Sequence, residues 1–454
     1  MSTDIEGAIP DVVRGLLRVL WDGGHAAYVV GGSLRDTLRG QEAKDWDLAT
    51  AARPERTVEL FPGAIYENKF GTVAVRTGDS AVDEVEITTF RSDHDYADFR
   101  RPHRVEFGES IELDLARRDF TVNAMAWGAE PGEQPQLVDP HGGQADLAAR
   151  TLRTVGEPAK RFDEDALRMV RAVRLAATLD FTVDPATLDA IRARAQLVRH
   201  LSGERIAMEM TKLLAADRPS IGLSLMADTG LLDAISPDLA AQRGVPQNKV
   251  PDEDLWDHTL RAVDGATKHP PHIRLAALLH DIGKPMTMAD GRFLGHESVG
   301  ANLADTLLEQ WRWPLAERQR IVTLVRQHMF GYQPTWSDAA VRRFIAKIGR
   351  DHLEDLFLLR EADHIGSGRE ADAGGLDELR ARVAAQLAAG VALDLRSLAV
   401  DGSDLMTELG MTPGPGLGRL LDWLLERVIA EPSANTRERL LDLARRRQSS
   451  EGAL

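Results

Sequence analysis

The sequence predicts an α+β domain at its N-terminus, a small mixed sheet with helices packed on it, followed by domains made only of helices. Apolar runs of strand-forming residues occur near the N-terminus, at residues 28–30, 72–75 and 82–89. After Gly156 the apolar residues recur at helical spacing instead. A chain of 454 residues is long for one hydrophobic core, so several domains are expected.

The composition is that of a globular, soluble protein, with 43% apolar and 28% charged residues. No apolar run approaches the roughly 20 residues that span a bilayer, and the N-terminus lacks a basic region followed by an apolar stretch. We therefore expect a cytoplasmic protein without a membrane partner. The absence of cysteine excludes disulfides, thiolate nucleophiles and Cys-ligated zinc, so metal ligands must come from His and carboxylates.

The formal net charge of −16 argues against broad, sequence-independent coating of nucleic acid. Residues 150–212 differ, because 12 Lys and Arg residues there exceed 9 Asp and Glu residues. This local excess of three positive charges indicates either a bound polyanion or an ordinary solvated helical face.

The first expected element is an amphipathic helix over residues 4–22. Its apolar side is formed by Val12, Leu16, Leu17, Val19 and Leu20. The strands at residues 28–30, 72–75 and 82–89 follow, and a turn rich in Gly and Pro at residues 139–143 closes this first domain.

The strand at residues 28–30 ends at Gly31 and Gly32, which let the backbone turn sharply and approach a ligand closely. Ser33 and Arg35 then open a short helix. Free N–H groups, a hydroxyl and a guanidinium therefore converge on one place, and this pattern predicts a phosphate-binding turn.

Asp45 and Asp47 begin the next strand-like run, and side chains two positions apart on a strand share a face. Two carboxylates on one face can hold hard divalent cations such as Mg²⁺ against nucleotide phosphates. Each half of the pattern has a simpler interpretation when alone. A Gly-Gly pair is usually a turn, and a D-x-D pair is usually a solvated strand end or a helix cap.

Within residues 28–50 a strand, a Gly-Gly turn, a helix and a D-x-D pair follow one another. This order resembles the head of nucleotidyltransferases of the polymerase-β type. The form GGxxRDxLxGxxxxDxDLAT is similar to the class II branch, which contains the CCA-adding tRNA nucleotidyltransferases and the bacterial poly(A) polymerases. The resemblance implies that Asp45, Asp47 and Glu86 hold two Mg²⁺ ions, that CTP and ATP are substrates, and that tRNA is the partner.

Residues 94–108 are polar and lack periodicity, which predicts a mobile loop over the site. In the CCA-adding enzymes a flexible loop at this position is associated with addition of the terminal A. Its presence therefore argues against an enzyme that adds only CC.

Residues 114–126, DLARRDFTVNAMA, resemble the second signature of the same family. Alone, they are compatible with an ordinary salt-bridged helix start. The resemblance implies instead contacts to the ribose and triphosphate, with the planar guanidinium of Arg118 matched to phosphate oxygens. The residues concerned are Arg117, Arg118, Asp119 and Asn123.

Asp165, Arg168, Arg171 and Arg174 recur at three-residue steps, so they stay near one another on a helix face. A row of surface ion pairs is the simple interpretation. The resemblance implies the EDxxR signature that selects the incoming nucleotide.

Base chemistry agrees with that role. A carboxylate accepts from the amino group of cytosine or adenine, while a guanidinium donates to the neighbouring ring nitrogen. Guanine and uracil present the reverse order, which a closed pocket rejects strongly. The pair Asp165 and Arg168 therefore predicts selection of C and A without a nucleic-acid template.

Residues 243–254 are rich in Gly, Pro and charge and indicate a linker. After it, the order of His258, His280-Asp281, His296, His328 and Asp363 resembles the HD superfamily of metal-dependent phosphohydrolases. The resemblance implies that His258, His280, Asp281 and Asp363 bind a second divalent metal inside a helical bundle. The simple alternative is a set of core-edge residues satisfied by hydrogen bonds.

Residues 409–428 look like the tail that follows the HD domain in bacterial tRNA nucleotidyltransferases. Four domains are therefore expected: a nucleotidyltransferase head (1–150), a helical neck that selects the nucleotide and binds tRNA (151–242), an HD domain (251–370) and a helical tail (371–454).

Two rival functions remain open at this point. A poly(A) polymerase shares the head and neck signatures, but residues 66–75, YENKFGTVAV, look like the tRNA enzymes. A phosphohydrolase with a degenerate RNA-binding head is disfavoured, because the glycines, the head carboxylates and the Asp165–Arg168 pair are all intact. The sequence thus favours template-independent addition of C, C and A to tRNA, with release of pyrophosphate.

Overall fold

The structure is a computed structural model, and it describes residues 4–43, 45–66, 71–96, 102–108, 110–247 and 249–451. The chain divides into two compact units, residues 1–240 with 310–312 and residues 241–309 with 313–454. The boundary falls beside the linker predicted at residues 243–254. The further boundaries expected within each unit remain predictions.

The first unit is built on a seven-stranded mixed sheet in the order β3-β4-β5-β2-β1-β8-β9. Its strands are Ala27–Val30 (β1), Trp46–Thr50 (β2), Ile65–Tyr66 (β3), Thr72–Arg76 (β4), Glu84–Thr89 (β5), Ala126–Ala129 (β8) and Gln136–Val138 (β9). β2 and β5 run parallel, whereas the other neighbours run antiparallel. The mixed sheet predicted from the sequence is confirmed, and it also contains strands that the apolar runs did not indicate.

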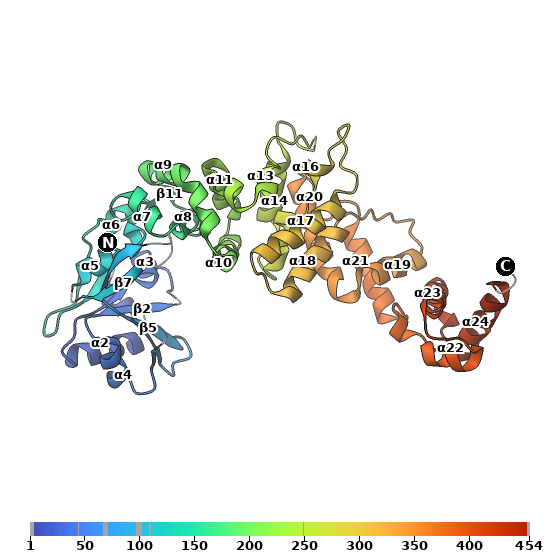
Figure 1. The fold of residues 1–454 in the computed structure, drawn as a ribbon, viewed down its shortest axis with the longest axis horizontal. Coiled ribbons are helices and arrows are strands. Elements are labelled where there is room, and N and C mark those ends of the chain that lie inside the picture. The colour runs from blue at the N-terminus through green and yellow to red at the C-terminus, as the bar shows by residue number, and fades with distance from the viewer. Residues whose placement is uncertain are drawn as a thin grey trace. The chain divides into compact units, whose positions relative to one another are not determined.

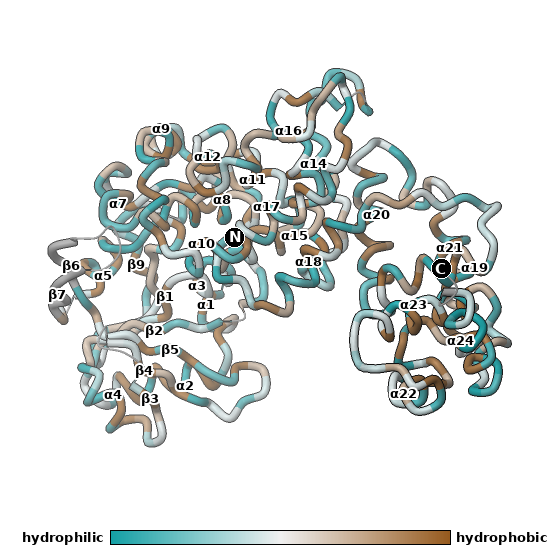
Figure 2. The backbone as a smooth tube through the Cα atoms, turned by 45° about the vertical axis from the view of Figure 1, so that its right-hand side comes forward, coloured by the Kyte–Doolittle hydropathy of each residue, from teal (hydrophilic) through white to brown (hydrophobic). Residues whose placement is uncertain are grey.

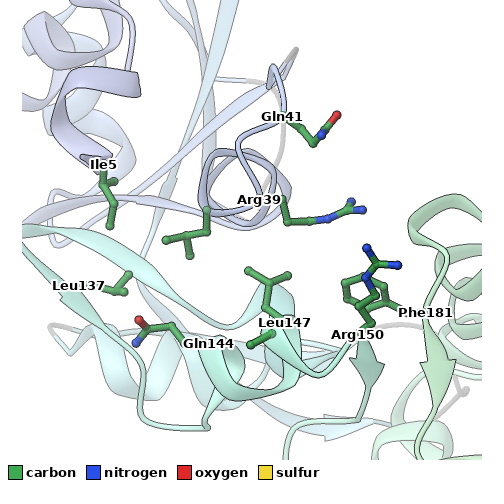
Figure 3. A pocket seen from close by; sticks show the side chains of 10 residues that line it. Ile5, Arg39, Gln41, Leu137, Gln144, Leu147, Arg150 and Phe181 are labelled. Carbon is green, nitrogen blue, oxygen red and sulfur yellow. The ribbon is translucent and has the colours of Figure 1, made fainter. Parts of the chain in front are cut away.

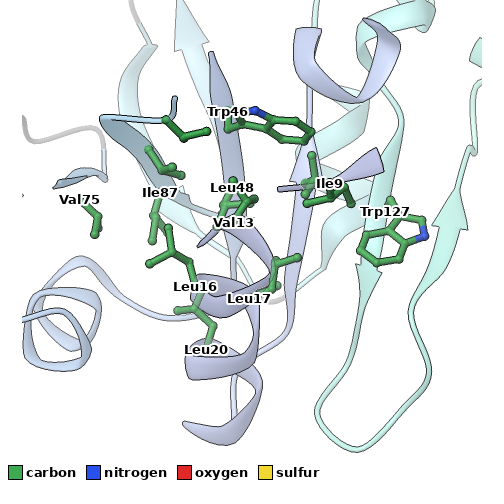
Figure 4. Close-up of a cluster of buried hydrophobic side chains, with 14 of the residues drawn as sticks. Ile9, Val13, Leu16, Leu17, Leu20, Trp46, Leu48, Val75, Ile87 and Trp127 are labelled. Carbon is green, nitrogen blue, oxygen red and sulfur yellow. The ribbon is translucent and has the colours of Figure 1, made fainter. Parts of the chain in front are cut away.

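The strand β1 is buried at all four positions. A strand covered on both faces is a continuous apolar run, which explains the sequence pattern at residues 28–30. On one face of the sheet, Val29 and Leu48 pack against the helix Asp11–Asp22 (α2), as Figure 4 shows for Leu48 and the α2 residues Val13, Leu16, Leu17 and Leu20. On the other face, Tyr28 and Val30 pack in a second core with Phe90 and Ile111.

The single helix expected over residues 4–22 is two helices, Ile5–Ala8 (α1) and α2. The break falls at Ile9 and Pro10, because a proline ring blocks an intrahelical hydrogen bond and is tolerated only at a helix start. The predicted apolar side is confirmed only in part. Leu16, Leu17 and Leu20 are buried as expected, whereas Val19 is 38% exposed and Val13, which was not predicted, is fully buried.

The mobile loop expected at residues 94–108 is largely an antiparallel hairpin. Its strands are Arg91–Tyr96 (β6) and Pro102–Phe107 (β7), with Arg91 opposite Phe107. Residues 97–101 of the predicted loop lie outside the described residues. A polar two-stranded ribbon lacks the apolar alternation that marks a strand with one buried face, so the sequence carried no strand signal here.

Helices complete the first unit (Figure 1). They are Gly32–Leu38 (α3), Pro54–Leu60 (α4), Ile111–Ala116 (α5), Gly143–Ala148 (α6), Pro158–Glu164 (α7), Leu167–Leu179 (α8), Pro185–Arg194 (α9), Gly203–Leu214 (α10), Pro219–Thr229 (α11), Leu231–Ile235 (α12) and Pro237–Ala240 (α13). A short parallel pair, Thr151–Leu152 (β10) and Thr182–Val183 (β11), joins the start of this helical part to the end of α8.

The second unit is helical in the part of the chain that the structure describes. Its helices are Leu255–Gly265 (α14), His272–Leu279 (α15), Lys284–Thr287 (α16), His296–Gln310 (α17), Leu315–Gln327 (α18), Asp338–Ile348 (α19), Leu353–Gly366 (α20), Leu376–Ala388 (α21), Gly402–Leu409 (α22), Pro415–Ala430 (α23) and Arg437–Glu451 (α24). The last three share a small core of their own that includes Leu405, Leu424 and Leu440. Hydrophobic and hydrophilic stretches alternate around these helices in Figure 2. Among the described helices, none combines the length and the apolar character needed to cross a bilayer.

Candidate active site and candidate metal centre

Three carboxylates lie along two adjacent strands of the head sheet. Asp47 on β2 is the register partner of Glu86 on β5, and Asp45 directly precedes β2. Trp46 and Leu48 point into the core, so Asp47 faces the opposite side of the strand. Burial and, next, the Glu86 carboxylate raise the pKa of Asp47 to about 6. This repulsion between carboxylates is what a bound cation would relieve.

The Gly-Gly turn brings Arg118 close to Asp47. Gly31 has a φ of 78°, a left-handed value that favours glycine. A Cβ atom on Gly31 would lie 3.3 Å from Arg118 Nη1 and 3.5 Å from Asp47 Oδ2. Glycine therefore leaves the space that these two groups occupy. Ser33 donates its hydroxyl to the carbonyl oxygen of Val30 at 3.2 Å, so this hydroxyl stabilises the turn itself.

A chain of hydrogen bonds connects the head to the helical part of the first unit. Arg35 binds both carboxylate oxygens of Asp36 and donates to Asn123 Oδ1 at 2.7 Å. Asn123 donates to Asp119 Oδ1 at 3.3 Å, and Arg171 donates to Asp119 Oδ2 at 2.8 Å. Burial opposes ionisation of Asp119, but Arg171 outweighs it and lowers the pKa of this carboxyl to about 2. Asp119 is therefore ionised, and its hydrogen bonds link the head to the helical part of the first unit.

Arg118 is oriented by the buried carboxylate of Asp114, which is 1% exposed. Its Nε and Nη2 donate to Asp114 Oδ2, while Arg117 donates to Oδ1. Burial opposes ionisation of Asp114, but the two guanidiniums hold its pKa below the usual value. Nε and Nη2 of Arg118 are thus held by Asp114, and the remaining nitrogen, Nη1, lies beside the glycine turn.

The two residues predicted to read the base are each held by a further charged residue. Asp165, in the turn between α7 and α8, accepts from Arg205 at 2.6 Å. Arg168 forms an ion pair with Glu164 and donates to the carbonyl oxygen of Arg117 at 2.9 Å. These partners restrict the orientation of both side chains. On the same helix α8, Arg174 donates to the buried Glu209 of α10 at 2.5 Å.

Two cavities, of about 460 and 560 Å³, gather all of the predicted head and neck residues. They share Gly32, Asp47, Asn123 and Arg171. The first cavity also contains Gly31, Glu86, Arg118, Asp119, Asp165 and Arg168. The second also contains Ser33, Arg35, Asp45 and Arg174. Of the three predicted carboxylates, Asp47 therefore lines both cavities, Glu86 only the first and Asp45 only the second.

The same cavities contain cationic residues that were not predicted as site residues. Arg91 and Arg205 line the first cavity, and Lys212 lines the second. Arg117, which the resemblance did place among the nucleotide contacts, also lines the first cavity. Arg205 and Lys212 lie on α10, which carries no motif of its own, so only the packing of α10 against α8 brings them to the site. The net positive charge of residues 150–212 was the one signal that pointed to this segment.

A separate cavity of about 630 Å³ in the first unit has a different character (Figure 3). Apolar side chains, among them Leu137 and Leu147, line it together with Arg39 and Arg150. It contains none of the predicted site residues, although Arg39 also lines the second cavity above.

Three family models match the chain in order. The first describes the "Poly A polymerase head domain" and matches residues 27–153. The second describes the "Probable RNA and SrmB- binding site of polymerase A" and matches residues 180–243. The third describes a putative tRNA nucleotidyltransferase domain 2 and matches residues 298–444. Head signatures alone do not distinguish tRNA enzymes from poly(A) polymerases, so similarity over the whole length decides.

A CCA-adding enzyme of Streptococcus suis is 33% identical over 422 residues, which cover 93% of this chain and 91% of that protein. The CCA-adding enzyme of Levilactobacillus brevis is 34% identical over 95% of this chain and 96% of its own length. The chain belongs to the CCA-adding enzyme family. It is accordingly a nucleotidyltransferase. The crystal structure of the Bacillus stearothermophilus CCA-adding enzyme with CTP is similar over 98% of this chain and all of that chain, with 29% identity and a TM-score of 0.73.

The second unit contains a buried cluster that the head reaction does not explain. Two sets of possible metal ligands meet there, one of His258, His280 and Asp363 and one of Asp281, His296 and His328. The four predicted residues His258, His280, Asp281 and Asp363 are thus brought together. His296 and His328 were part of the sequence order but were not predicted as ligands, and they join the cluster because α17 begins at His296 and α18 ends before His328.

Asp281 lies between the two sets. Its Oδ2 is 3.1 Å from His280 Nε2 and 3.3 Å from His258 Nε2, whereas its Oδ1 is 3.2 Å from His296 Nε2. On the first side, Asp363 Oδ1 lies 3.4 Å from His258 Nε2. Each oxygen of Asp281 therefore faces a different set.

The histidine tautomers fit a metal centre. Nδ1 of His280, His296 and His328 each lies 2.7 Å from the carbonyl oxygen three residues earlier, to which it can only donate. In a neutral ring Nε2 then carries a lone pair, and burial lowers the pKa of His280, which favours the neutral ring. His296 Nε2 and His328 Nε2 nevertheless face each other at 3.3 Å. Two facing lone pairs repel, and a shared cation would remove the conflict.

Proposed function

We propose that this protein adds C, C and A to the 3′ end of tRNA from CTP and ATP, without a nucleic-acid template and with release of pyrophosphate. The observation that carries the proposal is the single cavity in which the Asp47 and Glu86 carboxylates, the Arg118 guanidinium and the Asp165–Arg168 pair line the same space. Membership in the CCA-adding enzyme family supports the same reaction and tRNA as the partner.

Asp45, Asp47 and Glu86 would hold the divalent cations. All of their donor atoms are carboxylate oxygens, which suit the hard cation Mg²⁺. Burial and, next, the Glu86 carboxylate raise the pKa of Asp47, and a cation held there would favour its ionised form. Bound cations would lower the pKa of the attacking 3′-hydroxyl and stabilise the leaving pyrophosphate.

The protein's own groups would position the nucleotide. Arg118 lies beside the Gly31 turn and Asp47, so its fixed fork can bind triphosphate oxygens close to the reacting phosphorus. Asp165 and Arg168 would pair with the amino group and ring nitrogen of cytosine or adenine. Arg205 and Glu164 hold these two side chains, which limits their adaptation to guanine or uracil.

The direct test uses purified protein, tRNA that lacks its 3′ end, and each labelled nucleotide separately. CTP alone should add two residues, CTP with ATP should add three and then stop, and GTP and UTP should not be used. Long A tails on an unrelated RNA would instead favour a poly(A) polymerase and overturn the proposal.

We further propose that the second unit holds a metal-dependent phosphohydrolase centre. The specific observation is the split of Asp281 between two sets of ligands, His258, His280 and Asp363 on one side and His296 and His328 on the other. These six side chains would hold the metal, which would activate a water molecule for attack on phosphorus. Hydrolysis then joins the water oxygen to phosphorus and breaks the ester bond, and the departing alcohol takes up a proton.

Metal analysis tests this second activity, together with assays on p-nitrophenyl phosphate and on a 2′,3′-cyclic nucleotide. If the protein binds metal but hydrolyses neither compound, the centre is structural and the proposed hydrolase activity is overturned.

The division into head, neck, HD domain and tail, and a cytoplasmic location, also belong to this proposal. They rest on the sequence patterns described above.

A further inference from the structure

Residues 242–254, described except for residue 248, form a strap that is tied down at both ends. Near its start, Gln242 is fully buried and accepts from Thr259 at 2.6 Å. Towards its end, Pro246 bridges to Asp254, and the carbonyl oxygen of Val245 accepts from the first residue of α14 at 2.8 Å. A segment held at both ends can place the side chains of its middle with little freedom.

The middle of the strap reaches the metal centre. Lys249 Nζ lies 3.5 Å from Asp363 Oδ1, the oxygen that also faces His258. Gln247 Nε2 lies 3.5 Å from Asp281 Oδ2, and Gln247 Oε1 accepts from Lys284 at 3.3 Å. The strap therefore places the ammonium group of Lys249 beside Asp363 and the amide group of Gln247 beside Asp281.

The charges around the centre predict what it binds. Lys249 and Arg360 pair with Asp363, and Lys284 pairs with Asp281 at 2.6 Å. Glu297 lies 3.6 Å from His296. These three cationic side chains already offset the three carboxylates, so each divalent cation would add positive charge that no group named here neutralises. Such a centre requires an anionic ligand.

Resting on the phosphohydrolase centre proposed above, we propose that Lys249 binds the phosphate group of the substrate, which is a phosphate ester. Metal held by Asp363 would compete for the carboxylate to which Lys249 donates, while the strap keeps the ammonium group nearby. Phosphate oxygens on the cations would then supply a new acceptor, and a compact ammonium group suits them as a point charge. Lys249 is a substrate-binding residue in this scheme and not a metal ligand.

The test compares the full-length parent with Lys249→Met, and with Lys347→Met as the matched control, because Lys347 is an exposed lysine of the same unit. Metal content is measured on Mn²⁺-loaded protein, and inorganic phosphate is titrated into it by calorimetry. Lys249→Met should retain the metal and lose phosphate affinity by about tenfold or more, as expected for a charged hydrogen bond. Lys249→Arg should retain part of the phosphate affinity, and the control should match the parent.

A kinetic assay gives a second measurement. On p-nitrophenyl phosphate, Lys249→Met should raise KM more than it lowers kcat.

Each result decides a separate point. A parent that binds no metal overturns the metal centre and this inference together. A parent that binds metal and phosphate, with equal phosphate affinity in Lys249→Met, overturns only the role of Lys249. Loss of metal from Lys249→Met shows that the strap has a structural role and also overturns the inference. Phosphate binding that depends on Lys249 but comes without turnover overturns the hydrolase, and with it the substrate-binding role, and leaves Lys249 as an anion-binding residue only.

Discussion

The two candidate sites place carboxylates in opposite settings. In the first unit, Asp45 and Glu86 are exposed, and only Asp47 is largely buried. In the second unit all six candidate ligands are buried, and the most exposed of them, Asp363, is 7% exposed. The first site is assembled at strands and lined by guanidiniums, whereas the second is assembled from helices and lined by histidines.

The difference bears on the kind of cation that each candidate site would hold. An open site with only oxygen donors suits Mg²⁺ that arrives with a nucleotide and leaves with pyrophosphate. A closed site rich in imidazole suits a transition metal that stays bound. The comparison predicts that the two sites can be disabled independently, and that they differ in metal and in exchange.

The largest effect is expected at the open site. Asp47→Ala or Asp45→Ala should lower nucleotide addition by about a thousandfold or more, because each removes a carboxylate that is proposed to hold the catalytic cations. Binding of tRNA, measured by gel shift, should change little, and the metal content of the second unit should be unchanged. Asp83→Ala, at an exposed position before β5, is the matched control. Near-normal addition by either variant would contradict the metal assignment.

The closed site should lose its metal completely in the double variant His280→Ala, Asp281→Ala. Both changes remove donors, and Asp281 faces both sets of ligands. Elemental analysis should be made in a background that also carries Asp45→Ala and Asp47→Ala, so that head cations do not contribute. With the head intact, the same double variant should still add CCA. His200→Ala, an exposed histidine of the first unit, serves as the control. Equal metal in parent and double variant would make the cluster structural.

A smaller effect is expected on base selection. It separates the role of the residues that contact the base from the role of the residue that orients them. Asp165→Ala and Arg168→Ala should raise the use of GTP and UTP relative to CTP and ATP by about a hundredfold, because the polar match is lost. Arg205→Met should cause about a tenfold change, since it frees Asp165 without removing it, and Arg205→Lys should recover part of the selectivity. Competition assays measure the ratios, with Arg192→Ala as the control. Unchanged exclusion of GTP and UTP in all three would show that the pair is structural.

The smallest effect is a pH dependence of stability without metal. The pKa of Asp47 is raised to about 6 in the folded protein from 3.8, so its contribution to stability is complete below about pH 4 and is lost as pH rises through 6. The loss should stay below about 2 kcal/mol, because Asp47 retains some contact with solvent. In EDTA, Asp47→Asn should remove this loss relative to the parent when the unfolding free energy is compared at pH 5 and pH 7.5. Parallel profiles of the two proteins would contradict the pKa shift, and added Mg²⁺ should stabilise only the parent.

Local patterns predicted the fold class and most of the head site. The apolar run at residues 28–30 marks a strand buried on both faces, and a glycine at position 31 is required by its positive φ. Two expectations about elements were wrong for identifiable reasons. Pro10 interrupts the N-terminal helix, a signal that was present in the sequence, whereas the hairpin of β6 and β7 is polar and carries no apolar period.

The sequence by itself determined which kinds of chemistry the chain can perform, because spacings such as D-x-D and the three-residue steps from Asp165 are local and survive in any packing of their strand or helix. Only the tertiary structure decided which residues act together. It set Glu86 beside Asp47 across a parallel strand pair, Arg205 on Asp165, and His296 with His328 on Asp281. It also brought Lys249 of a linker to Asp363. Contacts between residues far apart in the chain depend on how helices and strands pack, and no short pattern in the sequence records that packing.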